Sequence, residues 1–338
     1  MIEKNQCVKS LSDYLRFLPD INEKIQSQWF YRGQSDVSYD LIPSVFRSKH
    51  RRREHDYYMK ALTSCPDDFD SSMSHADILV KMQHYGIPTR LLDVTQNPLV
   101  ALFFACLENN NGKDGVVFCI KPREWESTNR YEDFSLPIKS FDSDTMTILS
   151  SLPCLSCAEQ NRLMKHVAEI DDRILSEHTN IKTVEETMTI RNKLFANNPI
   201  AQKLLHEIRK EKPYFTANID IDDLKSNIFY IPRMMNPRVA QQSGAFLVFG
   251  AGESMIKADK LPLYAENQAH PIGSYRIRIS GRCKQRILQQ LEAFNGALIV
   301  VVTGGVLIHK HVEFHVAQAL EGQLSNIVIP LKWIQDKD

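Results

Sequence analysis

The sequence of 338 residues has no apolar run that approaches the roughly 18 residues of a membrane span. Its first residues, MIEKNQCVKSLSDYLRF, lack the apolar core of a signal peptide. Lys plus Arg total 41, as do Asp plus Glu, so no net charge attracts nucleic acid to the whole molecule. The seven cysteines, an odd and scattered set, indicate reduced thiols rather than disulfides. We therefore expect a soluble, cytoplasmic protein without a membrane partner.

Glycine is also scarce, with 13 in the chain, and none occurs from residue 141 to residue 212. That span carries helical patterns such as AEQNRLMKHVAEIDDRIL, whereas strand-like runs such as GVVFCI and GAFLVFG lie on either side of it. The sequence therefore predicts an α+β fold. We expect three parts, namely the N-terminal half of a core (1–140), a helical insertion (141–225), and the C-terminal half of the core with a tail (226–338).

The clearest local signal is the stretch PTRLLDVTQNPLVALFFACLE. Arg90–Thr95 is typical of a short strand, and Asn97 followed by Pro98 is typical of a helix N-cap and first helical position. Leu99–Leu107 is apolar on every side, which predicts a helix that is buried all round.

An arginine in the run Trp29-Phe30-Tyr31-Arg32-Gly33 requires an explanation, because a guanidinium stays charged and needs water or a polar or anionic partner. One interpretation is a structural ion pair, with Asp93 as a partner of either Arg32 or Arg90. The other interpretation is a binding site for an anion.

Three fragments, YRGQ (31–34), QHYGIPTRLLDVTQNPLVALFFA (83–105) and PRVAQQSGAF (237–246), together resemble the FRG domain, a mainly bacterial family. Tyr31 replaces the phenylalanine of the motif that names the family. The order of these fragments also resembles, less closely, the ADP-ribosyltransferase fold. That resemblance implies a split β-sandwich core with a helical insertion, and NAD as the cofactor.

The same resemblance implies roles for individual residues. Arg32 would anchor NAD, Thr95 would brace the site, and Gln242 would contact the nicotinamide ribose in place of the usual glutamate. Breaking the glycosidic bond of NAD gives the ribose oxocarbenium character, so a nearby acceptor stabilises the transition state. The expected catalytic residues are Gln242, Thr95 and Tyr31, and the expected cofactor-binding residues are Arg32, Gly33, Tyr85, His84 and Asn97.

The helix start at Asn97 presents N–H groups that suit an anion. Tyr31 or Tyr85 could stack on the nicotinamide ring. His84 could act as an acid or base, although a structural histidine is the alternative. Thr95 could equally serve only to cap the buried helix.

A basic run, Arg51, Arg52 and Arg53, is the one concentrated cationic patch of this neutral sequence. It is the expected contact for nucleic acid, or else a solvated helix face. The implied function is an ADP-ribosyltransferase-like toxin or phage-defence effector that modifies RNA, DNA or protein and is restrained by an antitoxin or inhibitory partner. The alternative is a non-catalytic module that binds a nucleotide or nucleic acid, which the uncharged Gln242 favours.

No metal site is expected. Cys154 and Cys157 form a single C-x-x-C pair without a second pair, so a zinc site is not predicted there. His309, His311 and His315 could converge on a metal, since 309 and 311 would share a strand face, but solvated residues of the tail are the preferred interpretation.

Overall fold

The computed structural model describes residues 7–18, 29–47, 50, 52–70, 72–107, 112–122, 138–139, 142–177, 184–215, 219–232, 244–251, 263–266 and 274–294. Within these ranges, none of the helices combines the length and apolar character that crossing a bilayer requires. The histidines at 309, 311 and 315 lie outside these ranges.

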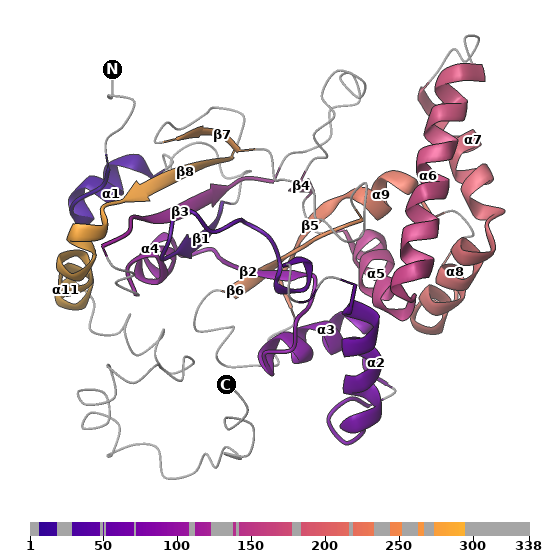
Figure 1. The fold of residues 1–338 in the computed structure, drawn as a ribbon, viewed down its shortest axis with the longest axis horizontal. Helices are drawn as coiled ribbons and strands as arrows, with labels where there is room; N and C mark the ends of the chain where they lie inside the picture. The colour runs from indigo at the N-terminus through magenta and orange to yellow at the C-terminus, as the bar shows by residue number, and fades with distance from the viewer. Residues whose placement is uncertain are drawn as a thin grey trace.

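The described strands form one mixed sheet of eight, in the order β4-β5-β6-β2-β1-β3-β8-β7 (Figure 1). Neighbouring strands are antiparallel except for the outer pairs β4–β5 and β7–β8. The strands are β1 (Phe30–Gln34), β2 (Leu91–Thr95), β3 (Gly115–Ile120), β4 (Ile138–Lys139), β5 (Asn227–Tyr230), β6 (Gly244–Val248), β7 (Leu263–Glu266) and β8 (Ser274–Ile279). Together with the helices, this sheet confirms the predicted α+β class.

The two central strands of the sheet, β1 and β2, share fewer paired residues than their neighbours do. β1 and β2 pair through a single residue position, Tyr31 opposite Thr95. By contrast, β1 pairs with β3, and β2 pairs with β6, along all five of their residues. The described sheet is therefore continuous, and the predicted split sandwich of two separate sheets is not confirmed. The two halves nevertheless diverge from each other beyond this single pair.

The sheet is also bent, and the bend brings side chains of β1 and β5 together on one face. Phe30 of β1 stacks on Phe229 of β5 with ring centroids 3.9 Å apart and an interplanar angle of 12°. In a flat sheet these strands would lie roughly 14 Å apart, because three spacings of about 4.8 Å separate them. The bend encloses a core that receives alternate residues of β3, namely Val116, Phe118 and Ile120. The other β3 residues face the opposite side of the sheet.

Between β4 and β5 the described chain is helical, and helices also flank both halves of the sheet (Figure 1). The helices are α1 (Leu11–Phe17), η1 (Ser44–Phe46), α2 (Glu54–Ser64), α3 (His75–His84), α4 (Pro98–Cys106), α5 (Ser143–Ser151), η2 (Leu152–Cys154), α6 (Cys157–Glu177), α7 (Val184–Ala196), α8 (Pro199–Glu211), α9 (Ile221–Lys225), η3 (Gly281–Cys283) and α11 (Lys284–Phe294).

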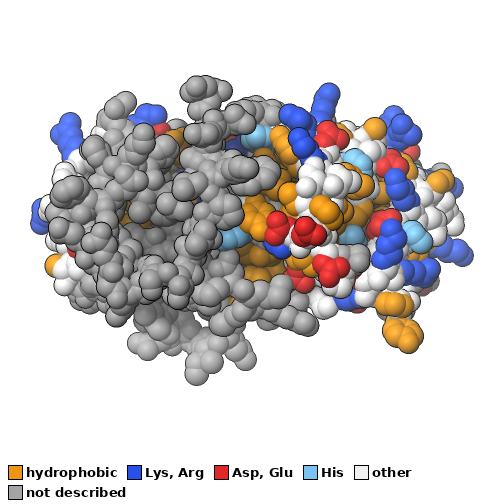
Figure 2. All heavy atoms as spheres, turned by 90° about the horizontal axis from the view of Figure 1, so that it is seen from below, with side chains coloured by type: hydrophobic (Ala, Val, Ile, Leu, Met, Phe, Trp, Pro, Cys, Tyr) orange, Lys and Arg blue, Asp and Glu red, His pale blue; other side chains and the backbone are white. Residues whose placement is uncertain are grey.

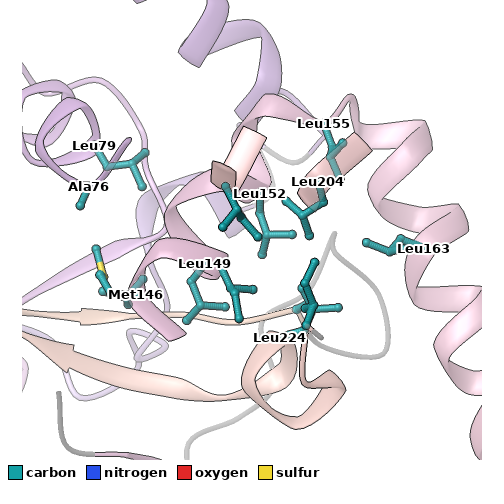
Figure 3. Packing of buried hydrophobic residues seen from close by; sticks show 14 of the residues in the cluster. Ala76, Leu79, Met146, Leu149, Leu152, Leu155, Leu163, Leu204 and Leu224 are labelled. Carbon is teal, nitrogen blue, oxygen red and sulfur yellow. The ribbon is translucent and has the colours of Figure 1, made fainter. Parts of the chain in front are cut away.

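Two further hydrophobic cores join helices to the sheet. The larger core packs the helical span 143–225, together with α2 and α3, against β2, β5 and β6. Figure 3 shows side chains of α3, α5, η2, α6, α8 and α9 that converge in it: Ala76, Leu79, Met146, Leu149, Leu152, Leu155, Leu163, Leu204 and Leu224. The second core packs α1, α4 and α11 against β1, β3 and β8. The helical span thus shares its core with half of the sheet.

Capping residues fix several helix starts. Asn97 is the N-cap of α4 and accepts from the Leu99 N–H at 2.9 Å, with Pro98 at the first helical position, as predicted. Ser156 and Glu159 form a reciprocal capping box at the start of α6, where the Ser156 N–H donates to Glu159 at 2.8 Å and the Glu159 N–H donates to Ser156 at 3.3 Å. Local sequence therefore sets these boundaries.

Candidate active site

Residues from the three sequence fragments meet in one row across the sheet. Thr95, the last residue of β2, lies opposite Tyr31 of β1 on one side and opposite Gly244 of β6 on the other. This row lies where the two halves of the sheet diverge. Gln242, the expected ribose-binding residue, precedes Gly244 by two positions in the sequence and lies outside the described residues.

A cavity of about 490 Å³ opens beside this row. Strands β1, β2 and β6 and helices α3 and α4 contribute to its walls. The lining residues are Tyr31, Arg32, Gly33, Val80, Gln83, His84, Gly86, Asp93, Val94, Thr95, Val100, Ala101, Phe104, Gly244, Ala245 and Phe246. Ligand sites commonly have volumes of about 300–1,000 Å³ and mostly apolar walls with a few polar groups. The cavity therefore has the size and lining of a small-molecule site.

Arg32 is the cation of this cavity. Its Nη1 donates to the backbone carbonyl of Asp93 at 2.6 Å and lies 3.9 Å from the Asp93 carboxylate. Its Nε is buried and has no hydrogen-bond partner among the described residues. Burial lowers the pKa of Arg32, Asp93 opposes this shift, and the nearby positive charge of Arg47 adds to it. The guanidinium thus retains an unused donor, and an anion in the cavity would relieve its repulsion from Arg47.

Asp93 belongs to a chain of polar contacts along one wall. Thr89 Oγ1 donates to Gln83 Oε1 at 2.6 Å, and Gln83 Nε2 donates to Asp93 Oδ2 at 2.9 Å. The Asp93 side chain is 61% exposed, so Arg32 is not sealed by its acidic neighbour. The contact agrees with the interpretation of Asp93 as an ion-pair partner of Arg32. Gln83 was not among the expected site residues, although it stands directly before His84.

Gly33 is required by a close approach of α4 to β1. A Cβ built at Gly33 would lie 1.8 Å from the Ala101 carbonyl oxygen and 2.7 Å from the Ala105 nitrogen. Both atoms belong to the backbone of α4, which therefore packs directly on the strand. Gly33 was expected to bind the cofactor, and it does line the cavity, but its missing side chain has this separate structural reason.

Other expected residues lie at the cavity in different settings. Tyr31 is buried, and its ring belongs to the core under α4. Thr95 is also buried, and its Oγ1 accepts from the Asn97 N–H at 3.0 Å. His84 ends α3 as an exposed residue. The cavity therefore brings together five of the expected residues: Tyr31, Arg32, Gly33, His84 and Thr95.

Two expected cofactor-binding residues do not line the cavity. Tyr85 is 51% exposed. Its hydroxyl donates to Asp68 at 3.0 Å, and its ring packs edge-on against Phe69. The Asn97 side chain is used as the helix cap, and α4 contributes to the cavity through its later residues Val100, Ala101 and Phe104. Tyr85 and Asn97 therefore lie outside the lining of this cavity, and their contact with a ligand stays a prediction.

The basic run lies at a different place. Helix α2 begins only at Glu54, so the predicted helix through the run starts later than expected. Arg52 has a φ of 70°. Burial raises the pKa of Cys157, and the positive charge of Arg52 partly opposes that rise. Arg53 lies 5.1 Å from the ring centroid of Tyr57, and Arg51 lies outside the described residues. Neither Arg52 nor Arg53 lines the cavity.

Surface charge is mixed on the face that Figure 2 shows. Among the described residues there, Lys and Arg side chains are interspersed with Asp and Glu rather than gathered into one cationic field. A long nucleic-acid contact over this face would therefore meet repulsive as well as attractive groups.

The second arginine of the motif region, Arg90, has a structural role. It is fully buried and forms a bidentate pair with Glu54, from Nε to Oε1 at 2.8 Å and from Nη2 to Oε2 at 2.5 Å. Its Nη1 donates to the Phe249 carbonyl at 3.1 Å. Arg90 thereby ties the start of α2 to β2 and the end of β6, which leaves Arg32 as the arginine that faces the cavity.

No curated protein and no solved structure matches this chain. The model of the FRG domain matches residues 27–114, a range that includes β1, α3, β2 and α4. The β6 wall of the cavity lies outside that range. The resemblance to the FRG domain is therefore confirmed for residues 27–114 of this chain.

Proposed function

We propose that the chain is an ADP-ribosyltransferase-like enzyme that cleaves NAD and transfers ADP-ribose to an acceptor. The observation that carries the proposal is Arg32, whose buried Nε has no partner among the described residues at the wall of the 490 Å³ cavity. A cation whose buried Nε is an unused donor favours an anionic ligand, and the pyrophosphate of NAD is one. Arg47 adds positive charge close to the same guanidinium.

The proposed reaction breaks the bond between ribose C1′ and the nicotinamide nitrogen. The bonding electrons leave with nicotinamide, and the ribose becomes cationic until the acceptor forms a new bond to C1′ and releases its proton. Arg32 would hold the pyrophosphate, and Thr95 would brace the nicotinamide end of the substrate. Apolar lining from Val100 and Phe104 would keep water away from the cationic intermediate.

A proton acceptor and a ribose contact complete the proposal. His84 and Asp93 line the cavity and are candidates for the group that receives the acceptor's proton. Gln242 is the proposed contact of the nicotinamide ribose, supported by the position of Gly244 at the cavity wall. An amide accepts a hydroxyl hydrogen bond but stabilises a cation less than a carboxylate does. We therefore expect slow turnover.

The second candidate is a module that binds a nucleotide without breaking it. The uncharged Gln242 favours this alternative, and so does the involvement of Asp93 with Gln83 and Arg32. Such a module would need Arg32 and the cavity but no catalytic group. Either function would suit a toxin or defence effector that acts on nucleic acid or protein and is held in check by an inhibitory partner.

The test is to incubate the purified chain with NAD, alone and with total cellular RNA or lysate protein, and to measure free nicotinamide. We expect release that Arg32→Ala abolishes, while the exposed Arg282→Ala control retains it. Gln242→Ala should lower release far more than Gln241→Ala, its sequence neighbour. Circular dichroism verifies that each variant is folded.

The outcomes separate the two candidates. NAD binding that depends on Arg32, without nicotinamide release, establishes the binding module and rejects the enzyme. Absence of both release and binding at millimolar NAD rejects both candidates. Equal activity of Arg32→Ala and the wild type would show that the cavity is not the site.

A further inference from the structure

Three metal-binding side chains meet in the helical layer, away from the cavity. They are His75, the first residue of α3, Cys154, the last residue of η2, and Glu207 in α8. Their ligand atoms all lie within 4.8 Å of one another. All three side chains are partly buried. An imidazole, a thiol and a carboxylate from three separate segments thus face one small volume.

We propose that His75, Cys154 and Glu207 bind one Zn²⁺ ion and leave its fourth position open. Zinc takes sulfur ligands at about 2.3 Å and nitrogen or oxygen ligands at about 2.0–2.2 Å, so two ligands of a tetrahedral ion lie roughly 3.5 Å apart. Cys154 Sγ lies 3.9 Å from His75 Nε2. Cys154 Sγ also lies 3.7 Å from His75 Nδ1. The imidazole must therefore turn its Nε2 toward the sulfur as the side chains close on the ion.

The surroundings of His75 fit a metal ligand. The Tyr58 hydroxyl lies 2.5 Å from His75 Nδ1, and the Glu211 carboxylate accepts from the His75 backbone N–H. A ligating histidine usually donates its second ring N–H to a neighbouring oxygen, which fixes the tautomer and the ring. With Nδ1–H donated to Tyr58, the lone pair of Nε2 is available to the ion.

The charge around the cluster also suits a cation. Cys154 as a thiolate and Glu207 would supply two negative charges. Lys210 donates to both Glu207 oxygens, at 2.9 and 2.7 Å, but its side chain is 55% exposed and can turn to solvent. An ion bound by one Glu207 oxygen would therefore replace the Lys210 contact on that oxygen.

The C-x-x-C pair does not form this cluster. Cys157 accepts from the Asn161 side chain at 3.5 Å instead and is absent from the group of three. The expectation of no zinc site followed from the missing second C-x-x-C pair. The folded chain instead brings His75 and Glu207, which are far from Cys154 in the sequence, next to it.

A bound ion would brace the cavity at a distance. It would join the start of α3 to η2 and α8, and the same helix α3 carries Val80, Gln83 and His84 to the cavity wall. This inference does not depend on the proposed function, because the ligands lie outside the cavity lining.

The experiment loads the full chain, cleared of metal with a chelator, with Zn²⁺ or with Co²⁺ as a spectroscopic probe. We expect one equivalent of Zn²⁺ by elemental analysis after gel filtration, and a thiolate-to-cobalt charge-transfer band with Co²⁺. Cys154→Ser should abolish that band and weaken Zn²⁺ binding at least tenfold. Cys157→Ser, the matched control from the same motif, should retain both. His75→Ala and Glu207→Gln should each weaken binding.

Three results would overturn the proposal. They are less than a tenth of an equivalent of Zn²⁺ at micromolar concentrations, a charge-transfer band that persists in Cys154→Ser, or a band that is lost in Cys157→Ser. A cobalt spectrum recorded on variants with wild-type circular dichroism separates ligand loss from unfolding. The spectroscopic readout needs no enzymatic activity.

Discussion

Replacing Gly33 with alanine tests the close contact between α4 and β1. The added Cβ would lie 1.8 Å from the Ala101 carbonyl oxygen, so the strand and helix must separate by roughly 1.6 Å to reach an ordinary contact of about 3.4 Å. Overpacking of this kind costs about 1–3 kcal/mol, and alanine recovers about 0.4–1 kcal/mol by restricting the unfolded chain. Because the opposing atoms are backbone, we expect a net loss of about 2 kcal/mol.

Urea denaturation of Gly33→Ala and the wild type measures this loss. Gly112→Ala is the matched control, because nothing lies within 4 Å of its Cβ and only its φ of +75° is strained. The control should lose about 1 kcal/mol through backbone strain alone. Ala101→Gly should not rescue Gly33→Ala, since the obstructing atom is a carbonyl oxygen. Stability of Gly33→Ala within about 0.5 kcal/mol of the wild type would refute the reasoning.

Three further predictions follow from the charged residues. Glu54→Gln leaves the buried Arg90 cation without its counter-ion, so urea denaturation should show a loss of about 3–5 kcal/mol, and a loss under 1 kcal/mol would contradict the pairing. Arg32→Lys keeps the positive charge but loses the two parallel N–H donors of the guanidinium, so calorimetry should show binding of ADP-ribose about tenfold weaker. Unchanged affinity would exclude a bidentate contact. Lys203 and Ser156 hold the pKa of Glu159 at about 2, below its usual 4.5. The thermal stability that Glu159 adds over Glu159→Gln should therefore be full above pH 4.5 and vanish as the pH falls to about 2, and a gap that persists there would argue against this origin.

Local sequence predicted the elements whose boundaries depend on local chemistry. The N-cap Asn97 and Pro98 start α4 as expected, because both residues act on the first turn alone. The strand Gly115–Ile120 also coincides with the strand-like run GVVFCI. Helix α1 ends at Phe17, since Pro19 disfavours helical backbone in Leu18.

Features that depend on long-range packing were not predicted. The alternation of residues in β1 and β2 gives no sign that the two strands diverge after Tyr31 and Thr95. The bend that stacks Phe30 on Phe229 depends on the twist of the whole sheet. Gln83 was overlooked because its role depends on where α3 packs and not on its own sequence.

The two functions of Arg32, in the fold and toward a ligand, must be separated by the choice of variant. The ladder between β1 and β2 stops at Tyr31 and Thr95, and beyond it the guanidinium of Arg32, rather than the backbone, donates to the Asp93 carbonyl at 2.6 Å. Arg32→Ala removes this bond as well as the cation, so a loss of binding in that variant alone does not separate the two functions.

A lysine at position 32 is long enough to donate to the same carbonyl, but it offers no second donor in a fixed plane. If Arg32→Lys retains stability while binding weakens, the unused Nε is the group that recognises the ligand. If both variants lose stability in parallel with binding, the arginine acts mainly by closing the gap between the strands. The site would then belong to the neighbouring groups, Thr95 above all, because it joins all three strands in one row.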